Sequence, residues 1–341
     1  MKAAVYYTNS DVRIEERPMP VAGKGEIVVK IEASGICGSD VMEWYRIKKA
    51  PIVLGHEIAG TIEELGEGVT KFKLGDRVTV AHHVPCNTCR HCLTGNQSVC
   101  ETLRTTSFDP GGFCEFVRVP AINVDRGTFL LPSNVSFLAG TFAEPLGCVV
   151  RGLNKSGFKP GMNVLVIGSG ISGMLHIKLF KALGAGFVAA TDIDEYRLSV
   201  AEKLGADMVM NGAFEDVSES IKEKTGRLCD LVVLCAAPDS AIKQGLASVE
   251  KGGGILFFAP KEPGETYPLP LFDLWRDNIN IYNTYASPPA ETMAAIDLIA
   301  SGRVTVEDMI SHRLGIDEAE KGFELVAGAG ESLKVIIEPQ R

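Results

Sequence analysis

The sequence predicts an α/β protein of two domains, one rich in β-strands and one built on a doubly wound parallel sheet. A chain of 341 residues is too long for one simple core. From about Asn163, short apolar runs alternate with helix-like stretches, whereas the preceding residues show alternating strands with many glycines and prolines. We therefore expect a β-rich domain over residues 1–147, a doubly wound domain over residues 148–286, and a return to the first domain over residues 287–341.

The doubly wound domain is predicted from six apolar runs: NVLVIG, GFVAATD, DMVMN, DLVVLC, GGILFFA and NINIYNTY. Helix-like stretches such as 174–183 and 195–204 separate them. Strands that are apolar throughout are typical of a parallel sheet covered on both faces.

The flanking segments predict the β-rich domain. IVVKIEA, RVTVAH and FVRVP alternate apolar and polar residues, as strands with one buried face do. After residue 289 come a helical stretch, 290–300, and strand-like pieces ending in KVIIEP. These are too short for a third core, so we expect them to join the first domain.

Charge and composition restrict the partners. The formal net charge is −9, and no basic patch offsets it, which excludes nucleic acid and an anionic membrane surface. The first residues lack a signal-peptide pattern, and no stretch approaches 18 uninterrupted apolar residues. We expect a cytoplasmic protein with a small-molecule substrate, and in that reducing compartment clustered cysteines indicate metal ligands.

A glycine-rich loop, GSGISG at residues 168–173, directly follows the strand NVLVI and opens a helix. The first glycine permits the tight turn, the second admits a pyrophosphate, and the third lets helix and strand pack closely. We predict dinucleotide binding through Gly168, Gly170, Ile171, Ser172 and Gly173. The alternative is a tight packing turn.

Asp192 ends the next strand, where a carboxylate accepts hydrogen bonds from the hydroxyls of the adenosine ribose. A 2′-phosphate at roughly 4 Å would be repelled by on the order of 4 kcal/mol per unit charge at an effective dielectric near 20. Arg197 is the only nearby cation that would relieve this repulsion. The pattern therefore predicts NAD as the cofactor.

Four cysteines lie close together in the segment PCNTCRHCLTGNQSVC. Their C-x2-C-x2-C-x7-C spacing predicts a zinc site with four thiolate ligands, Cys86, Cys89, Cys92 and Cys100. Such a site leaves no position for substrate, so we expect a structural role. A disulfide or free thiols are the alternative, and we expect structural roles for the nearby His82, His83 and His91.

A second metal site depends on family resemblance, because Cys37 in SGICGSD and His56 in LGHEIAG are by themselves more typical of a buried thiol and a core histidine than of metal ligands. The chain resembles the zinc-dependent medium-chain dehydrogenase/reductases over essentially its whole length. The resemblance lies in the GHE motif with its spaced glycines, in CGSD, in the four-cysteine lobe, and in GDRV, GSGISG and the C-terminal SHR.

The resemblance implies a GroES-like catalytic domain, a Rossmann domain and a catalytic zinc in the cleft between them. Cys37 and His56 match two ligands, and the third family position falls on Glu144, as in the polyol and threonine dehydrogenase branches. Cys148, one helical turn further on, is a rival ligand. Glu57 is similar to a family carboxylate that binds zinc directly or holds the zinc-bound water, and its alternative role is to orient the ligands.

These ligands leave a coordination position for an alcohol, whose alkoxide can release hydride to NAD. Ser39 matches the family hydroxyl that passes the alcohol proton toward solvent. Many relatives continue this relay through a histidine three residues later, where this chain has Met42. The segment 41–54 is also shorter than usual and carries Trp44 and Tyr45, which implies an open mouth and a bulkier substrate.

Three functions compete. The first is NAD-dependent oxidation of a secondary alcohol or polyol. The second is L-threonine 3-dehydrogenation, for which Arg46, Lys48, Arg313 and Glu43 are candidate partners of the substrate's charged groups. The third is a non-catalytic zinc- and NAD-binding sensor or structural protein. The resemblance also implies a homo-oligomer, either a dimer or a tetramer, with two zinc ions per subunit.

Overall fold

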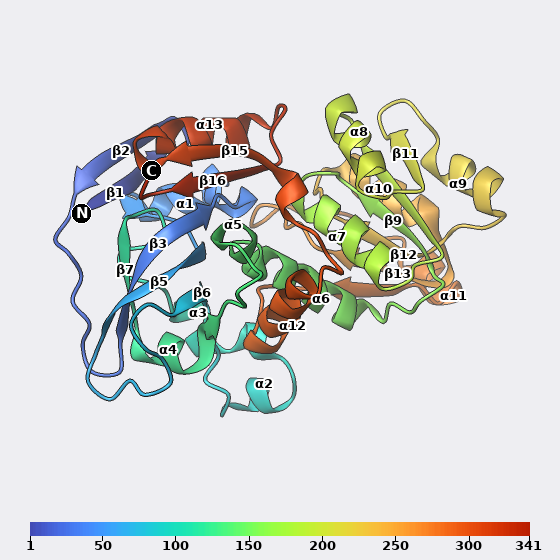
Figure 1. Cartoon of the computed structure of the whole chain (residues 1–341). Coiled ribbons are helices and arrows are strands. Elements are labelled where there is room, and N and C mark those ends of the chain that lie inside the picture. Colours follow the sequence, from blue (N-terminus) through green and yellow to red (C-terminus); the bar gives the residue numbers. More distant parts are fainter. The chain divides into compact units, whose positions relative to one another are not determined.

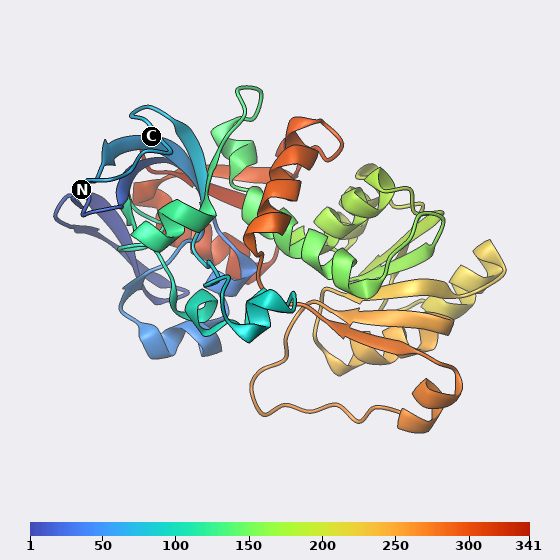
Figure 2. The ribbon, with the colours of Figure 1, turned by 90° about the horizontal axis from the view of Figure 1, so that it is seen from below.

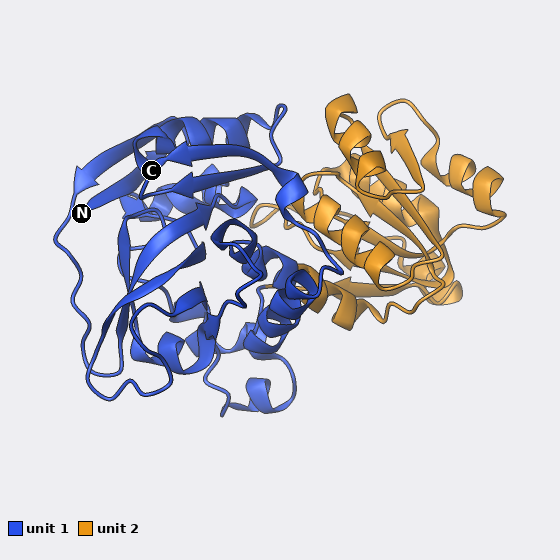
Figure 3. Ribbon diagram, in the orientation of Figure 1, with its two compact units in different colours: residues 1–148, 286–341 blue, residues 149–285 orange.

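The computed structural model describes residues 1–341, which form two compact units. The first unit contains residues 1–148 and 286–341, and the second contains residues 149–285 (Figure 3). Each unit has its own sheet system and its own buried apolar residues.

The second unit is built on one six-stranded sheet whose paired strands are all parallel (Figure 1). Its strand order is β11-β10-β9-β12-β13-β14. The order reverses between β9 and β12, as in dinucleotide-binding sheets, where ligands bind at the carboxyl ends of the strands beside this point. The predicted doubly wound fold is confirmed. The strands are β9 (Asn163–Ile167), β10 (Phe187–Asp192), β11 (Met208–Asn211), β12 (Cys229–Leu234), β13 (Val249–Phe257) and β14 (Asn280–Asn283).

Helices connect these strands, as the alternating sequence pattern predicts. All five residues of β9 are buried, which accounts for its uninterrupted apolar sequence. In Figure 2 the stretch between β13 and α11 runs as an extended loop. The helices are α7 (Ile171–Ala182), α8 (Glu195–Lys203), α9 (Val217–Thr225), α10 (Asp239–Ser248) and α11 (Leu271–Arg276).

The first unit contains a three-stranded sheet, β2-β1-β4, and a seven-stranded sheet ordered β15-β16-β3-β5-β6-β8, with β7 also paired to β3. The C-terminal strand β16 pairs antiparallel with β3, so the C-terminal segment completes the sheet that contains β3 and β5. The strands are β1 (Lys2–Thr8), β2 (Asp11–Glu16), β3 (Ile27–Gly35), β4 (Ile52–Val53), β5 (Glu57–Leu65), β6 (Arg77–Ala81), β7 (Phe116–Val119), β8 (Thr128–Leu130), β15 (Ile310–Gly315) and β16 (Lys334–Glu338).

Mostly short helices join the strands of the first unit. Its core packs Tyr6, Phe113 and Phe323 against aliphatic residues of the sheets. None of the chain's helices combines the length and apolar character needed to cross a bilayer. The helices are α1 (Glu43–Arg46), α2 (Arg90–Leu93), α3 (Glu101–Thr105), α4 (Ala121–Gly127), α5 (Phe137–Gly140), α12 (Pro289–Ala300), α13 (Ala319–Gly328), and α6 (Ala143–Ser156), which continues into the second unit.

Candidate functional site

The glycine-rich loop joins β9 to the start of α7, the position at which such loops bind pyrophosphate. Gly168 has a φ of +93°, which an L-residue adopts only with strain. A Cβ on Gly173 would lie within 3 Å of the carbonyl oxygen of Gly168, so this glycine permits the close packing of helix and loop. A Cβ on Gly170 would meet no atom within 4 Å, which leaves room beside the backbone for a ligand.

Asp192 ends β10 and fastens the same loop. Its carboxylate accepts hydrogen bonds from the backbone amides of Ser169 (2.7 Å), Ile193 (2.8 Å) and Asp194 (3.1 Å). Arg197 lies in the first turn of α8, and its backbone amide donates to the side chain of Asp194, the N-cap residue of that helix. The structure therefore brings the predicted ribose-binding carboxylate to the glycine-rich loop.

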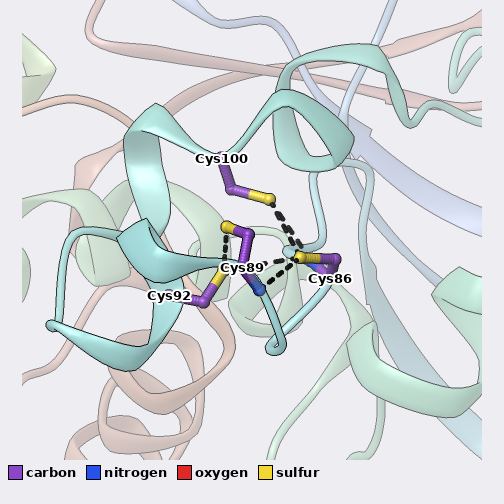
Figure 4. Close-up of side chains that lie close together, drawn as sticks. All are labelled: Cys86, Cys89, Cys92 and Cys100. Atoms are coloured by element: carbon purple, nitrogen blue, oxygen red, sulfur yellow. Dashed lines mark hydrogen bonds between the residues drawn. The ribbon is translucent and has the colours of Figure 1, made fainter.

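The four cysteines of the lobe converge, as Figure 4 shows. Neighbouring sulfurs lie 3.5 Å (Cys89–Cys92), 3.6 Å (Cys86–Cys100) and 3.9 Å (Cys86–Cys92) apart. Four sulfurs bound tetrahedrally at about 2.3 Å from one zinc ion would be separated by about 3.8 Å. All nine cysteines of the chain are free thiols, so no disulfide forms in the lobe.

The lobe has few apolar residues with which to hold its shape. Its buried cluster contains only Cys92, Cys100 and Leu103, while Leu93 is 75% exposed. Hydrogen bonds from Thr88 lower the pKa of Cys86 to about 5, whereas burial raises the pKa of Cys92 to about 12. A bound cation would stabilise all four thiolates, which fits the donor set to zinc.

A second set of possible metal ligands lies in the first unit. The ligand atoms of Cys37, His56 and Glu57 all lie within 4.8 Å of one another. Cys37 follows β3 and caps a short 3-10 helix (Gly38–Asp40), and His56 directly precedes β5. Gly55 has a φ of +95°, and a Cβ there would collide with the backbone of residues 112 and 113. This close approach of two backbone segments fixes the start of β5 beside Cys37.

Asp40 orients the histidine of this set. Its side chain is fully buried, with Oδ1 3.4 Å from His56 Nδ1 and Oδ2 accepting from the backbone amide of Cys37 at 3.1 Å. Burial acts to lower the pKa of His56, but the charges of Asp40 and Cys37 outweigh it and raise this pKa well above its usual value. Asp40 and Cys37 thus favour a positive charge at this position, and a bound metal ion would supply it.

Glu57 is buried and paired with Lys334, the first residue of β16, whose side chain is also fully buried. Lys334 Nζ also donates to the carbonyl oxygen of Ile36 at 3.3 Å. Gly35 leaves room for the pair, because a Cβ there would press against Glu57 Oε2 and the end of the Lys334 side chain. Lys334 was not predicted as part of the site, since nothing local in the sequence connects it to a residue 277 positions earlier.

Replacing Lys334 with Met should destabilise the protein by roughly 3 kcal/mol, because it leaves the Glu57 carboxylate buried without its cation. Urea unfolding of the zinc-loaded protein measures this loss. The double variant Lys334→Met/Glu57→Gln should recover part of it. Lys71→Met, which breaks an exposed pair with Asp125, is the control and should change stability little. Equal stability of Lys334→Met and wild type would refute the role of the pair.

Glu144 and Cys148 lie one turn apart on α6, and Cys148 Sγ donates to Glu144 Oε1 at 3.4 Å. Neither belongs to the set formed by Cys37, His56 and Glu57. Burial raises the pKa of Glu144, and the charges of His56 and Glu57 also act on this carboxyl group. Burial, followed by the Glu144 charge, raises the pKa of Cys148 well above its usual value. Cys148 therefore supports the Glu144 carboxyl group through this hydrogen bond.

Two further neighbours of the metal-ligand set stand out. Ser39 Oγ accepts a hydrogen bond from Arg46 Nη2 at 3.1 Å. The ring of His82 lies 4.7 Å from that of His56, and His82 Nδ1 is buried without a hydrogen-bond partner. From the sequence, His82 was expected to have an ordinary structural role, and its spacing gave no signal of this contact.

Comparisons with known proteins agree with this geometry. The alcohol dehydrogenase GroES-like domain matches residues 23–128, and the zinc-binding dehydrogenase domain matches residues 172–301. L-threonine 3-dehydrogenase of Bacillus velezensis is 34% identical, with 99% of each chain covered, and sorbitol dehydrogenase of Bacillus subtilis is 30% identical, covering 100% of this chain and 98% of its own. A zinc-binding dehydrogenase of Sinorhizobium meliloti, crystallised with NADP, superposes with a TM-score of 0.88 at 28% identity over 99% of both chains.

Proposed function

Since the chain belongs to the zinc-dependent medium-chain dehydrogenase/reductases, we propose that it oxidises a secondary alcohol, and a polyol in particular, to a ketone with NAD as hydride acceptor. It is an oxidoreductase acting on CH–OH groups, and its cofactors are zinc and a nicotinamide dinucleotide. The observation that carries the proposal is the convergence of one thiol, one imidazole and one carboxylate beside Ser39.

In this proposal Cys37, His56 and a carboxylate hold the catalytic zinc, and the four-cysteine lobe holds a structural zinc. Zinc lowers the pKa of bound water from 15.7 to about 7, and a comparable shift for an alcohol is about 8 units, or roughly 11 kcal/mol. Asp40 holds the His56 ring through Nδ1, which leaves Nε2 for the metal. Ser39 accepts the substrate's hydroxyl proton, and the glycine-rich loop positions the dinucleotide that accepts the hydride.

We propose Glu144 as the third protein ligand. The hydrogen bond from Cys148 would fix the orientation of its carboxylate, as supporting groups do at metal sites. In this arrangement Cys148 supports the carboxylate through its hydrogen bond and is not itself a ligand. Glu57 would then be an alternative ligand, whose carboxylate is paired with Lys334.

The candidate partners for a substrate carboxylate support a polyol over threonine. Arg46 already binds Ser39 and Asp40, and Arg313 forms two hydrogen bonds with Glu338 at 2.7 and 2.8 Å. Lys48 remains, and it is exposed on the surface. L-threonine 3-dehydrogenation stays the second candidate, because relatives of that name reach 34% identity.

A substrate panel tests the proposed reaction. Purified zinc-loaded enzyme is assayed for NAD reduction with sorbitol, xylitol, 2,3-butanediol, threonine and simple secondary alcohols. We expect the highest kcat/KM for a polyol or diol. A higher value for threonine would replace the first candidate by the second, and failure to oxidise any alcohol would contradict the proposal.

Asp192 should set the preference for NAD. We expect kcat/KM to favour NAD over NADP by about 10²-fold or more, because the 2′-phosphate would meet the Asp192 carboxylate. Asp192→Asn removes the charge but keeps an oxygen for the loop amides. The ratio of kcat/KM for NAD to kcat/KM for NADP should therefore fall at least about tenfold. Asp216→Asn is the matched control, since Asp216 also caps backbone amides but lies at α9. A wild-type preference for NADP would show the assignment to be wrong.

A further inference from the structure

The end of the proton relay is the unexplained part of the first unit. Where many relatives have a relay histidine, three residues after Ser39, this chain has Met42. A methionine thioether is only a weak acceptor and cannot carry a proton onward. The polar group that contacts the Ser39 hydroxyl is instead Arg46, one helical turn further along at the end of α1.

Arg46 donates hydrogen bonds to both the backbone and the side chain of Ser39. Its Nε donates to the Ser39 carbonyl oxygen at 2.8 Å, and its Nη2 donates to Ser39 Oγ at 3.1 Å. The same Nη2 lies 3.4 Å from Asp40 Oδ1, the oxygen that faces His56. One guanidinium therefore joins the hydroxyl and the carboxylate that flank the metal-ligand set.

The side chain of Arg46 is well ordered by its surroundings. It is 14% exposed, and its guanidinium lies over the Tyr45 ring, 4.6 Å from the centroid. The backbone amide of Arg46 donates to the Met42 carbonyl oxygen at 3.0 Å, which closes the single turn of α1. Stacking and the rigid fork of the guanidinium reduce the entropy lost in holding this position.

The chemistry of the contact fixes the direction of the hydrogen bond. A guanidinium has donors only and stays protonated at any physiological pH, so Ser39 Oγ must be the acceptor. One lone pair of Oγ is thereby occupied, which leaves one lone pair to accept the substrate's proton and one O–H to release a proton. Without Arg46 the serine hydroxyl would rotate among its staggered positions.

We propose that Arg46 is a positioning residue of the reaction, which locks Ser39 in the rotamer that accepts the substrate's hydroxyl proton. The inference rests on the proposed role of Ser39. In the oxidation direction the substrate O–H bond breaks as a new bond to Ser39 Oγ forms, and the serine's own proton passes to water. Arg46 takes no proton, so the relay that the missing histidine would extend ends at the serine.

A double-variant cycle tests this assignment, using zinc-loaded Ser39→Ala, Arg46→Gln, Arg46→Lys and Ser39→Ala/Arg46→Gln. We expect Arg46→Gln to lower kcat roughly 10- to 100-fold with KM for the alcohol changed less than about threefold, the range for losing a hydrogen bond from a charged donor. The double variant should lose no more than Ser39→Ala alone, because both changes remove the same contact. Arg46→Lys should recover part of kcat, since an ammonium reaches only one acceptor at a time.

Three readouts distinguish this role from others. Zinc content of the Arg46 variants should match the wild type, and the variants should stay folded at the assay temperature although the buried Asp40 loses one partner. This result separates positioning of Ser39 from loss of metal through Asp40. Arg13→Gln is the matched control. Arg13 also lies over a tyrosine ring and donates to an aspartate, but it belongs to β2 and contacts none of the proposed site residues. It should leave kcat unchanged.

The outcomes separate the two proposals. If Ser39→Ala keeps wild-type kcat, the proposed role of Ser39 fails. Three other results would overturn only the inference about Arg46, provided that Ser39→Ala is impaired. Arg46→Gln keeps the wild-type kcat, or it raises only KM, or the double variant loses more kcat than Ser39→Ala alone.

Discussion

Replacing Cys37 with Ser should lower kcat/KM by at least about 10³-fold, equivalent to roughly 4 kcal/mol of transition-state stabilisation. Cys37 supplies the only thiol of the set formed with His56 and Glu57, and a serine hydroxyl is a poor zinc ligand at neutral pH. The loss of the ion would remove most of the roughly 11 kcal/mol by which zinc favours the deprotonated alcohol. Steady-state NAD reduction with the best alcohol of the panel measures the effect.

The fold should survive this change, because Cys37 lies in a loop after β3 and not in the core of the first unit. The circular dichroism spectrum and the melting temperature should stay close to wild type. Cys114→Ser is the control: this buried thiol donates to the carbonyl oxygens of Gly111 and Phe116, a role that serine can fill. It should retain activity, and similar losses in both variants would contradict the assignment of Cys37.

Replacing Cys92 with Ser should have the opposite profile, lowering the free energy of unfolding by more than about 3 kcal/mol. Only three buried residues support the lobe, so its shape depends on the metal that its four sulfurs are spaced to bind. Chelation of zinc from the wild type should produce the same loss of stability. Differential scanning calorimetry with and without a chelator measures both effects.

The division of labour between the two sites depends on the contrast between these variants. Cys92→Ser should keep a measurable kcat at temperatures below its lowered melting point, whereas Cys37→Ser should not. Equal damage to folding from both substitutions would show that the two groups of ligands do not have separate roles.

Periodicity predicted the parallel sheet because its strands are apolar throughout, and each of the six runs became one strand in a sheet of order β11-β10-β9-β12-β13-β14. The glycine-rich loop could also be predicted from the sequence, since its function depends on local backbone geometry. The lobe was predicted from spacing alone, because its four ligands lie within one short segment.

The surroundings of the second metal-ligand set were much less predictable. Cys37 and His56 could be paired only through family resemblance, because the contact between them arises from the packing of β3 against β5. The partner of Glu57 comes from the C-terminal strand, and a lysine at the start of this strand carries no sign of which carboxylate it will meet. Arg46 was one of four candidate partners for the charged groups of a threonine substrate, whereas in the structure it binds Ser39 and Asp40.

Metal analysis of the purified subunit tests the central claim most directly. Inductively coupled plasma mass spectrometry should find two equivalents of zinc per wild-type subunit and one in Cys37→Ser, with the remaining ion held by the four-cysteine lobe. A wild-type subunit that binds a single equivalent, retained in full by Cys37→Ser, would contradict the account.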